Sequence, residues 1–345
     1  PYTQYPSKPV EQGDGSADDG AAVSIISRGG GYQSEGDTIE VSITGGNLIS
    51  DNNAAVTSYR LEKVDGKWQT NDATKVDNYL TSLTIGSNAS LQGSDAKGTL
   101  ELDARVEKTA VTINNGATFV PSKGVDQYLG EDQALGEDGS VGDLATAGAA
   151  KIGDKTYKTL EEALKAAKSG DTIVLQRNVA TGAITLPKGV TLDGNNHVIT
   201  CNTEIANGAF ITATGDNVTI KNATVNVDGK AKHGIQFYRV KGGKLENVNV
   251  MGGRYTAVIV NGAEVSINGG NLSTNGYAVV EYAMGKNVTE VPKLTMNNVT
   301  TPNTDKPLVY MDKATVDRIK ENTEGLKDAT TEQVLEYLKK ENLTG

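Results

Sequence analysis

Six basic or aromatic residues of this sequence fall close together and could bind a ligand. They are Lys232, His233, Tyr238, Arg239, Arg254 and Tyr255. Tyrosine rings stack on the apolar face of a sugar, and lysine and arginine side chains pair with carboxylates. If the chain folds so that these residues meet, they form a small basic and aromatic patch on an otherwise acidic protein. Such a patch would suit an acidic sugar.

The same residues also have a simpler interpretation. The dipeptides Asn207-Gly208, His233-Gly234 and Asn275-Gly276 are typical of equivalent turns, and His233 would then only replace an asparagine. The sequence favours this turn interpretation, and the ligand-binding interpretation stays open beside it. A stacked arrangement would place Tyr255 against Asn275 or Gly276.

Other reactive residue types lack a spacing that indicates catalysis or metal binding. Asp193, Asp216 and Asp228 stand beside Gly or Asn, where turn chemistry explains them. The single cysteine, Cys201, lies in an apolar strand-like run, which indicates a buried structural thiol. We therefore expect no catalytic residues, no metal site and no cofactor.

The charge balance excludes some classes of partner. The chain of 345 residues has 33 basic and 43 acidic side chains, for a formal charge of −10. Nucleic acids and anionic membranes bind basic surfaces, so neither is an expected partner. The sequence contains no apolar run of 18 residues or more, so we expect no insertion into a membrane. Aromatic residues make up only 5%, which favours thin aliphatic layers over one large globular core.

A short pattern repeats through the second half of the chain. Four similar segments begin at Val218, Lys244, Val265 and Leu294. Each segment has an Asn or Gly at the same place, and these residues are separated by 25, 22 and 29 positions: Asn222, Asn247, Gly269 and Asn298. A second strand-like pattern runs in phase, over 209–213, 234–238, 256–260, 277–282 and 307–311. Two strand signals per repeat predict an all-β solenoid of parallel strands, in which Asn provides left-handed turns.

Similar segments at 38–48, 83–91 and 111–119 extend the prediction to the first half of the chain. The expected organisation therefore has two stacked or tandem modules. The predicted parts are a flexible lead (1–20), a first β-solenoid module (21–120), an acidic and Gly-rich connection (121–150), a second module (151–311) and a helical tail (312–345).

Helices are predicted at both ends of the second module. Thr159 and Glu162 have the spacing of a capping box, and an apolar stripe follows over 160–168. An amphipathic helix there would cover the raw end of a solenoid, which otherwise invites aggregation. We expect the helical tail to cap the opposite end or to dock on the side.

The opening of the second module resembles a known family. The segment Lys155-Thr-Tyr-Lys-Thr-Leu-Glu-Glu-Ala-Leu-Lys-Ala-Ala-Lys-Ser-Gly-Asp-Thr-Ile-Val-Leu, followed by Gly189-Val-Thr-Leu-Asp-Gly-Asn-Asn-His-Val-Ile-Thr, is similar to the start of right-handed parallel β-helix modules of bacterial cell-surface proteins. These modules belong to the pectate-lyase-like superfamily. The resemblance implies a right-handed parallel β-helix at the bacterial cell surface. It does not imply one reaction, because members include lyases, hydrolases, adhesins and structural repeats.

Two functions follow as expectations. The first is a non-catalytic extracellular protein, namely a surface stalk, adhesin, surface-layer or filament subunit. Its partners would be other copies, neighbouring modules of the same surface protein, and carbohydrate. The alternative is a β-helix polysaccharide lyase or glycoside hydrolase that acts on an acidic polysaccharide. Lyases of the superfamily hold calcium with clustered Asp residues, and the aspartates of this sequence fall at different phases of the repeat.

Overall fold

The computed structural model describes residues 2–3, 9–12, 15–18, 20–28, 36–70 and 79–342. Within these residues the fold is mostly β, and most paired strands run parallel, which confirms the all-β class. The chain divides into two compact units, Pro1–Gly148 and Ala149–Gly345. Each unit is described by itself.

In its described residues the first unit contains a five-stranded parallel sheet, a four-stranded sheet in which β7 alone pairs antiparallel, two separate antiparallel hairpins and three short helices. Its strands are β1 (Tyr2–Thr3), β2 (Pro9–Gln12), β3 (Gly15–Asp18), β4 (Val23–Arg28), β5 (Ile39–Ser50), β6 (Val56–Val64), β7 (Lys67–Thr70), β8 (Leu80–Gln92), β9 (Leu100–Glu101), β10 (Val111–Ile113), β11 (Thr118–Val120), β12 (Gln133–Leu135) and β13 (Val141–Asp143). Its helices are η1 (Lys108–Ala110), η2 (Asp126–Tyr128) and α1 (Leu144–Ala147).

The three similar segments of the first unit stack as the sequence predicts. Strands β5, β8 and β10 pair in parallel, so that Ile43, Ile85 and Ile113 follow one another in register. These three side chains are buried in the core of the unit. The stacking lets each strand cover the apolar side chains of the next.

The segment 121–150 differs from the predicted connection. Strands β12 and β13 form an antiparallel hairpin within it, and Val125, Leu135 and Val141 are buried in the core of the first unit. The Gly116 amide donates to the Val141 carbonyl and the Val141 amide donates to the Ala117 carbonyl, and these bonds tie the hairpin to the stacked strands. These apolar residues stand singly among Gly and Asp, so the sequence shows no periodic strand pattern there.

The predicted flexible lead also contains strands. Strand β1 pairs with the end of β5, and β2 pairs with β3 in a hairpin. Regular structure therefore begins earlier in the chain than the composition of residues 1–20 indicates. The remaining residues of the lead, apart from residue 20, lie outside the described part of the chain.

The second unit contains a sheet of eleven strands and a sheet of six. The larger sheet consists of β14 (Ala150–Ile152), β15 (Lys155–Tyr157), β16 (Thr172–Leu175), β17 (Val179–Thr181), β19 (Thr191–Asp193), β20 (Val198–Cys201), β22 (Thr219–Asn226), β24 (Gly243–Gly253), β26 (Glu264–Asn268), β27 (Leu272–Thr274) and β29 (Lys293–Asn297). The smaller sheet consists of β18 (Ile184–Leu186), β21 (Ala209–Ala213), β23 (His233–Tyr238), β25 (Thr256–Asn261), β28 (Val280–Ala283) and β30 (Val309–Met311). The helices are α2 (Leu160–Ala166), α3 (Lys313–Asn322) and α4 (Thr331–Asn342).

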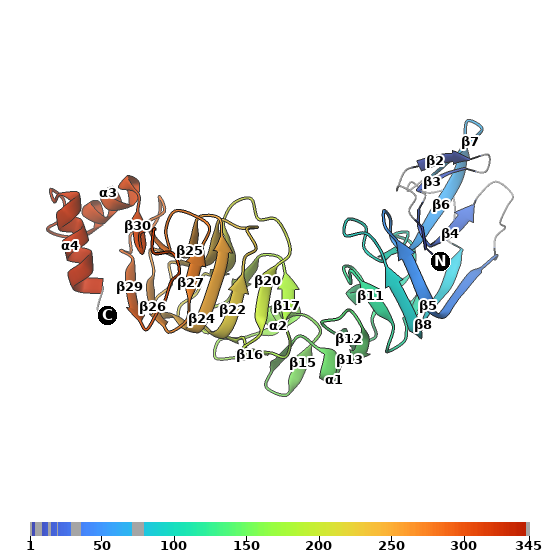
Figure 1. Ribbon diagram of the computed structural model, residues 1–345, viewed down its shortest axis with the longest axis horizontal. Helices are drawn as coiled ribbons and strands as arrows, with labels where there is room; N and C mark the ends of the chain where they lie inside the picture. Colours follow the sequence, from blue (N-terminus) through green and yellow to red (C-terminus); the bar gives the residue numbers. More distant parts are fainter. Residues whose placement is uncertain are drawn as a thin grey trace. The chain divides into compact units, whose positions relative to one another are not determined.

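Successive passes of the chain lie side by side along this unit (Figure 1). Strands β16, β19, β22, β24, β26 and β29 pair in parallel in chain order. The repeated position of the sequence pattern occurs at equivalent points, and its residues all have positive φ: Asn222 (50°), Asn247 (54°), Gly269 (70°) and Asn298 (54°). Asn and Gly adopt this left-handed conformation at the lowest cost, which explains their recurrence.

The first strand edge of the larger sheet is covered in two ways. Strand β14 pairs antiparallel with β16 and satisfies its backbone, while α2 buries Leu160 and Ala163 against the same end of the core. Thr159 is confirmed as the N-cap, because its hydroxyl accepts a bond from the Glu162 amide at 3.1 Å, while the Glu162 carboxylate accepts from the Lys158 amide at 3.0 Å rather than from that of Thr159. The predicted cap helix is therefore correct, although the edge itself is covered by the β14–β15 hairpin.

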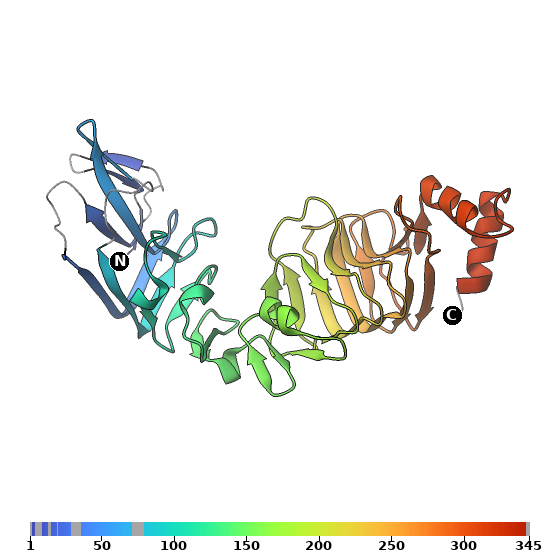
Figure 2. The same ribbon diagram turned by 180° about the vertical axis from the view of Figure 1, so that it is seen from behind.

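The helical tail covers the other end of the same core. Helices α3 and α4 follow the last strands in both views (Figures 1 and 2). Val316 and Ile319 of α3 and Val334 and Leu338 of α4 are buried in the core cluster, whereas Leu335 is 40% exposed. The tail thus caps the end of the unit. Among the described helices, none is long and apolar enough to cross a membrane.

Two leucines of α4 test the capping role. Leu338 is 2% exposed and Leu335 is 40% exposed on the same helix. We expect Leu338→Ala to lower the free energy of unfolding by about 2–5 kcal/mol, because it leaves a cavity in the core. Leu335→Ala serves as the matched control and should cost well under half as much. Urea denaturation followed by circular dichroism measures both, and equal losses would contradict the packing of α4 as a cap.

Candidate functional site

The strongest candidate site lies where the chain enters the strands of the smaller sheet. The amide of Tyr255 donates to the carbonyl of Lys232 at 2.7 Å, and the amide of Tyr277 donates to the carbonyl of Tyr255 at 3.0 Å. These three residues therefore occupy the same corner on successive passes of the chain. Only glycine fits at Gly276, because a Cβ atom there would lie 2.0 Å from the carbonyl oxygen of Tyr255.

Three tyrosines form a row across successive passes. The ring centroids of Tyr255 and Tyr277 are 5.5 Å apart, and those of Tyr277 and Tyr310 are 5.0 Å apart. Their exposed fractions are 40%, 41% and 39%, so each ring packs on one side and meets solvent on the other. We call Tyr255, Tyr277 and Tyr310 the tyrosine row. It offers a partly apolar surface supported by a sheet.

His233 lies at one end of the row and faces a buried hydroxyl. Its ring is 5.9 Å from that of Tyr255 in an edge-on arrangement, and its Nδ1 atom is 2.7 Å from Oγ1 of Thr256. Burial, together with the charge of the nearby Lys232, lowers the pKa of His233 to about 4. The imidazole is therefore neutral near pH 7. Its 3.8 Å approach to Glu281 is then not an ion pair.

Glu281 places a carboxylate beside the row. Its side chain is 16% exposed, and Oε2 accepts a hydrogen bond from the Tyr277 hydroxyl at 2.6 Å. Burial raises the pKa of Glu281, with a further increase from Asp312, while the bond from Tyr277 opposes the increase. Burial, together with the bond to Glu281, also raises the pKa of Tyr277. The carboxylate fixes the orientation of one ring of the row.

Two lysines at this corner contact the protein itself. The Lys232 ammonium lies 5.2 Å from the centre of the Tyr255 ring, which is a cation–π distance. The Lys306 ammonium donates to the carbonyl of Gly276. Both charges are thus held at the margin of the row.

The structure brings together three of the six residues that the sequence singles out: Lys232, His233 and Tyr255. Arg254 instead pairs with Glu204 and donates to the carbonyls of Ile205, at 2.8 Å, and Ala206, at 3.3 Å, so its guanidinium holds a neighbouring loop. Tyr238 and Arg239 lie at the opposite end of β23.

Sequence reasoning missed Tyr277, Glu281 and Tyr310. The alignment of turns placed Asn275 or Gly276 against Tyr255, and the structure shows that the partner is Tyr277. The signal was available, because Tyr277 stands 22 residues after Tyr255 and the repeated Asn and Gly positions show the same separation. An error of one or two residues at the corner hid the row.

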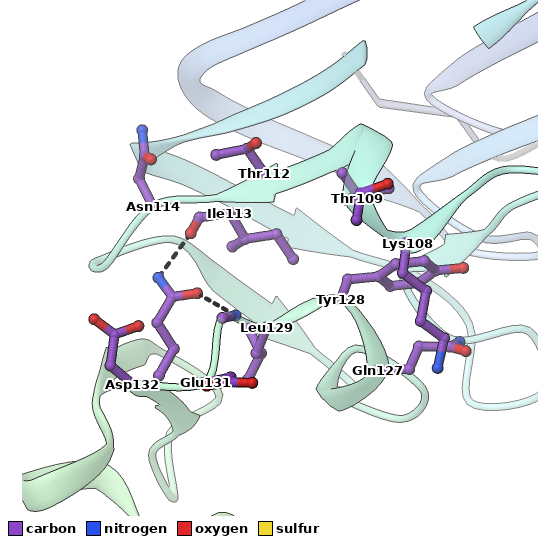
Figure 3. A pocket seen from close by; sticks show the side chains of 13 residues that line it. Lys108, Thr109, Thr112, Ile113, Asn114, Gln127, Tyr128, Leu129, Glu131 and Asp132 are labelled. Carbon is purple, nitrogen blue, oxygen red and sulfur yellow. Dashed lines mark hydrogen bonds between the residues drawn. The ribbon is translucent and has the colours of Figure 1, made fainter. Parts of the chain in front are cut away.

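A second candidate site, a hollow, lies in the first unit (Figure 3). It has a volume of about 520 Å³ and lies between strand β10 and residues 127–133. The side-chain amide of Gln133 spans it, donating to the Ile113 carbonyl at 2.8 Å and accepting from the Gly130 amide at 2.9 Å. Burial raises the pKa of Tyr128 in its wall. The Gln133 amide that bridges the hollow is occupied in holding residues 127–133, so this hollow is the weaker candidate.

Within the described part of the chain, no group of three or more His, Cys, Asp or Glu side chains is arranged to hold a metal ion. Comparison of the chain with family models, curated proteins and solved structures gave no match. The functional proposal therefore rests on the geometry of the site.

The burial of His233 predicts a pH-dependent stability. Its pKa is about 4 in the folded protein against 6.5 for the free side chain, so the unfolded chain takes up the proton first. Stability should therefore fall as the pH decreases from about 6.5 to 4, by up to about 3 kcal/mol from this residue. In His233→Gln this contribution should be absent. Urea denaturation at several pH values measures the difference.

The chain has one other histidine, His197, and His197→Gln is the control. It should keep the acid-dependent loss of the unmodified protein. Parallel pH profiles for His233→Gln and the unmodified protein would show that the imidazole is not buried in its neutral form.

Proposed function

We propose that this chain is a non-catalytic structural and adhesive protein of the bacterial cell surface, built as a right-handed parallel β-helix, which contacts glycans through the tyrosine row. The observation that carries the proposal is the row itself, with three rings about 40% exposed, one in β30 and two just before β25 and β28. Aromatic rings that are buried on one side and open on the other suit the apolar face of a pyranose.

The architecture supports a role in display. Parallel strands stacked in register form an elongated scaffold whose length grows with the number of passes. In the second unit the two ends of the stack are covered, by the β14–β15 hairpin with α2 and by α3 with α4. A covered stack does not add copies of itself by strand pairing. We therefore place self-association, where it occurs, at other surfaces or through neighbouring modules of the same surface protein.

Removal of the row tests the adhesive function. We expect the purified chain to be retained on immobilised polysaccharide, with cellulose, chitin and pectin as probes. Tyr255→Ala combined with Tyr277→Ala should weaken retention at least about tenfold, because two stacking contacts are lost. Tyr157→Ala, in β15 of the larger sheet, is the control and should bind as the unmodified chain does. Equal retention of all three proteins, or none on any probe, would refute adhesion through the row.

Glu281 favours a carbohydrate-active enzyme as the second candidate. It is a largely buried carboxyl with a raised pKa, and it is hydrogen-bonded to Tyr277 beside His233. Such a group can act as a general acid. The non-catalytic proposal predicts that prolonged incubation with pectin or a neutral glycan releases neither reducing ends nor unsaturated sugars. Release that disappears in Glu281→Gln would establish the enzyme instead.

A further inference from the structure

The smaller sheet of the second unit carries one outward column of side chains across all six strands. The pairing register places these residues one after another: Thr185, Thr212, Gln236, Ile259, Glu281 and Tyr310. Their chain neighbours Ile235 and Val258 are fully buried in the core, so the column lies on the opposite face. Tyr310 is the last member of the column, while Tyr255 and Tyr277 precede β25 and β28, so the tyrosine row adjoins the last passes of a longer feature.

The chemistry of the column changes along its length. Thr185, Thr212 and Gln236 provide hydroxyl and amide groups that are exposed or half-buried. The other end provides the rings of Tyr277 and Tyr310 together with the Glu281 carboxylate. A sugar chain needs both kinds of contact, because its hydroxyl groups form hydrogen bonds while its C–H faces stack on rings. Ile259, in the middle of the column, is only 7% exposed. An extended ligand along the column would therefore contact the polar side chains at one end and the rings at the other, and would pass over Ile259 with little contact.

The spacing of the column fits a polymer rather than a single sugar. Neighbouring strands are about 4.8 Å apart, so six strands span roughly 24 Å. The tyrosine rings repeat at similar intervals of 5.5 and 5.0 Å. This interval is close to the length of one pyranose unit in an extended chain, so each strand of the column except β25, whose Ile259 is 7% exposed, can contact one sugar.

The charges around the column favour a neutral ligand. The Glu281 carboxylate lies in the column and would repel an acidic sugar above it. The two nearby ammonium groups keep their positive charge but lie at the margin of the tyrosine row, that of Lys232 over the Tyr255 ring and that of Lys306 on the Gly276 carbonyl. Arg254 is bound to Glu204. A sugar carboxylate directly above Glu281 is therefore disfavoured at this face. The acidic sugar that the six residues of the sequence would suit is thus not the expected ligand of the column.

We infer that the outer face of the six-stranded sheet is a track for a neutral, unbranched glycan, which runs across the strands and contacts about five or six sugar units. This inference rests on the function proposed above and specifies its ligand. Calorimetry with β-1,4-linked oligomers of glucose and of N-acetylglucosamine, from two to eight units, tests it. Affinity should rise with each added unit up to about six and then level off.

A variant in the polar half of the column separates the track from the tyrosine row. Thr212→Val removes one hydroxyl with little change of shape, and it should weaken binding of the six-unit oligomer about fivefold while leaving the two-unit oligomer unaffected. Thr200→Val is the matched control, because Thr200 lies in β20 of the other sheet. It should bind both oligomers as the unmodified chain does.

The outcomes distinguish the inference from the proposed function. Affinity that stops rising at two units, or an unaffected Thr212→Val, would overturn the track and leave adhesion by the tyrosine row intact. Tighter binding of an oligogalacturonate than of the neutral oligomers would overturn the neutral ligand class only. No retention on any polysaccharide, as tested above, would overturn the proposed function itself.

Discussion

A strand at the end of a parallel ladder hydrogen-bonds to one neighbour, and the backbone N–H and C=O groups of its other edge stay unpaired. Only the next pass of the chain, or a cover, can bond to that edge. In the second unit this constraint fixes the register of one pass against the next and requires both ends of the stack to be covered. The antiparallel strand β14 bonds to the first edge of the larger sheet, and α3 and α4 bury the last apolar layer. The covers are thus consequences of the ladder.

The same register builds the candidate site. Ile235 and Val258 face the core in adjacent strands, so Gln236 and Ile259 must be adjacent on the outer face. At the corner, backbone bonds between successive passes hold one tyrosine over the next. The ring spacing of 5.5 Å follows the spacing of the strands rather than any contact peculiar to the rings. A site made in this way is rigid, because moving one ring would require moving a strand.

The sequence predicted those features that depend on the local chemistry of one or two residues. Asn222, Asn247 and Asn298 mark left-handed turns, and Thr159 with Glu162 marks a helix start, because each depends on local chemistry. The tyrosine row depends on the length of the corner between turns, which varies from pass to pass. An error of one residue there changes which side chains meet. The folded segment 121–150 was missed for a related reason, since its buried residues are isolated and show no period.

Rigidity decides what such a face can bind well. A ligand that meets side chains already fixed by strand pairing costs the protein little conformational entropy on binding. The gain from each contact is small, so affinity must come from several contacts made in the same register. An extended polymer with a repeat close to the strand spacing meets that condition, whereas a compact ligand reaches one ring or two. Arg254 is paired with Glu204, and the ammonium groups of Lys232 and Lys306 lie at the margin of the tyrosine row, so the rings provide the central contacts. The arrangement of strands therefore favours length and regularity in the ligand over its charge.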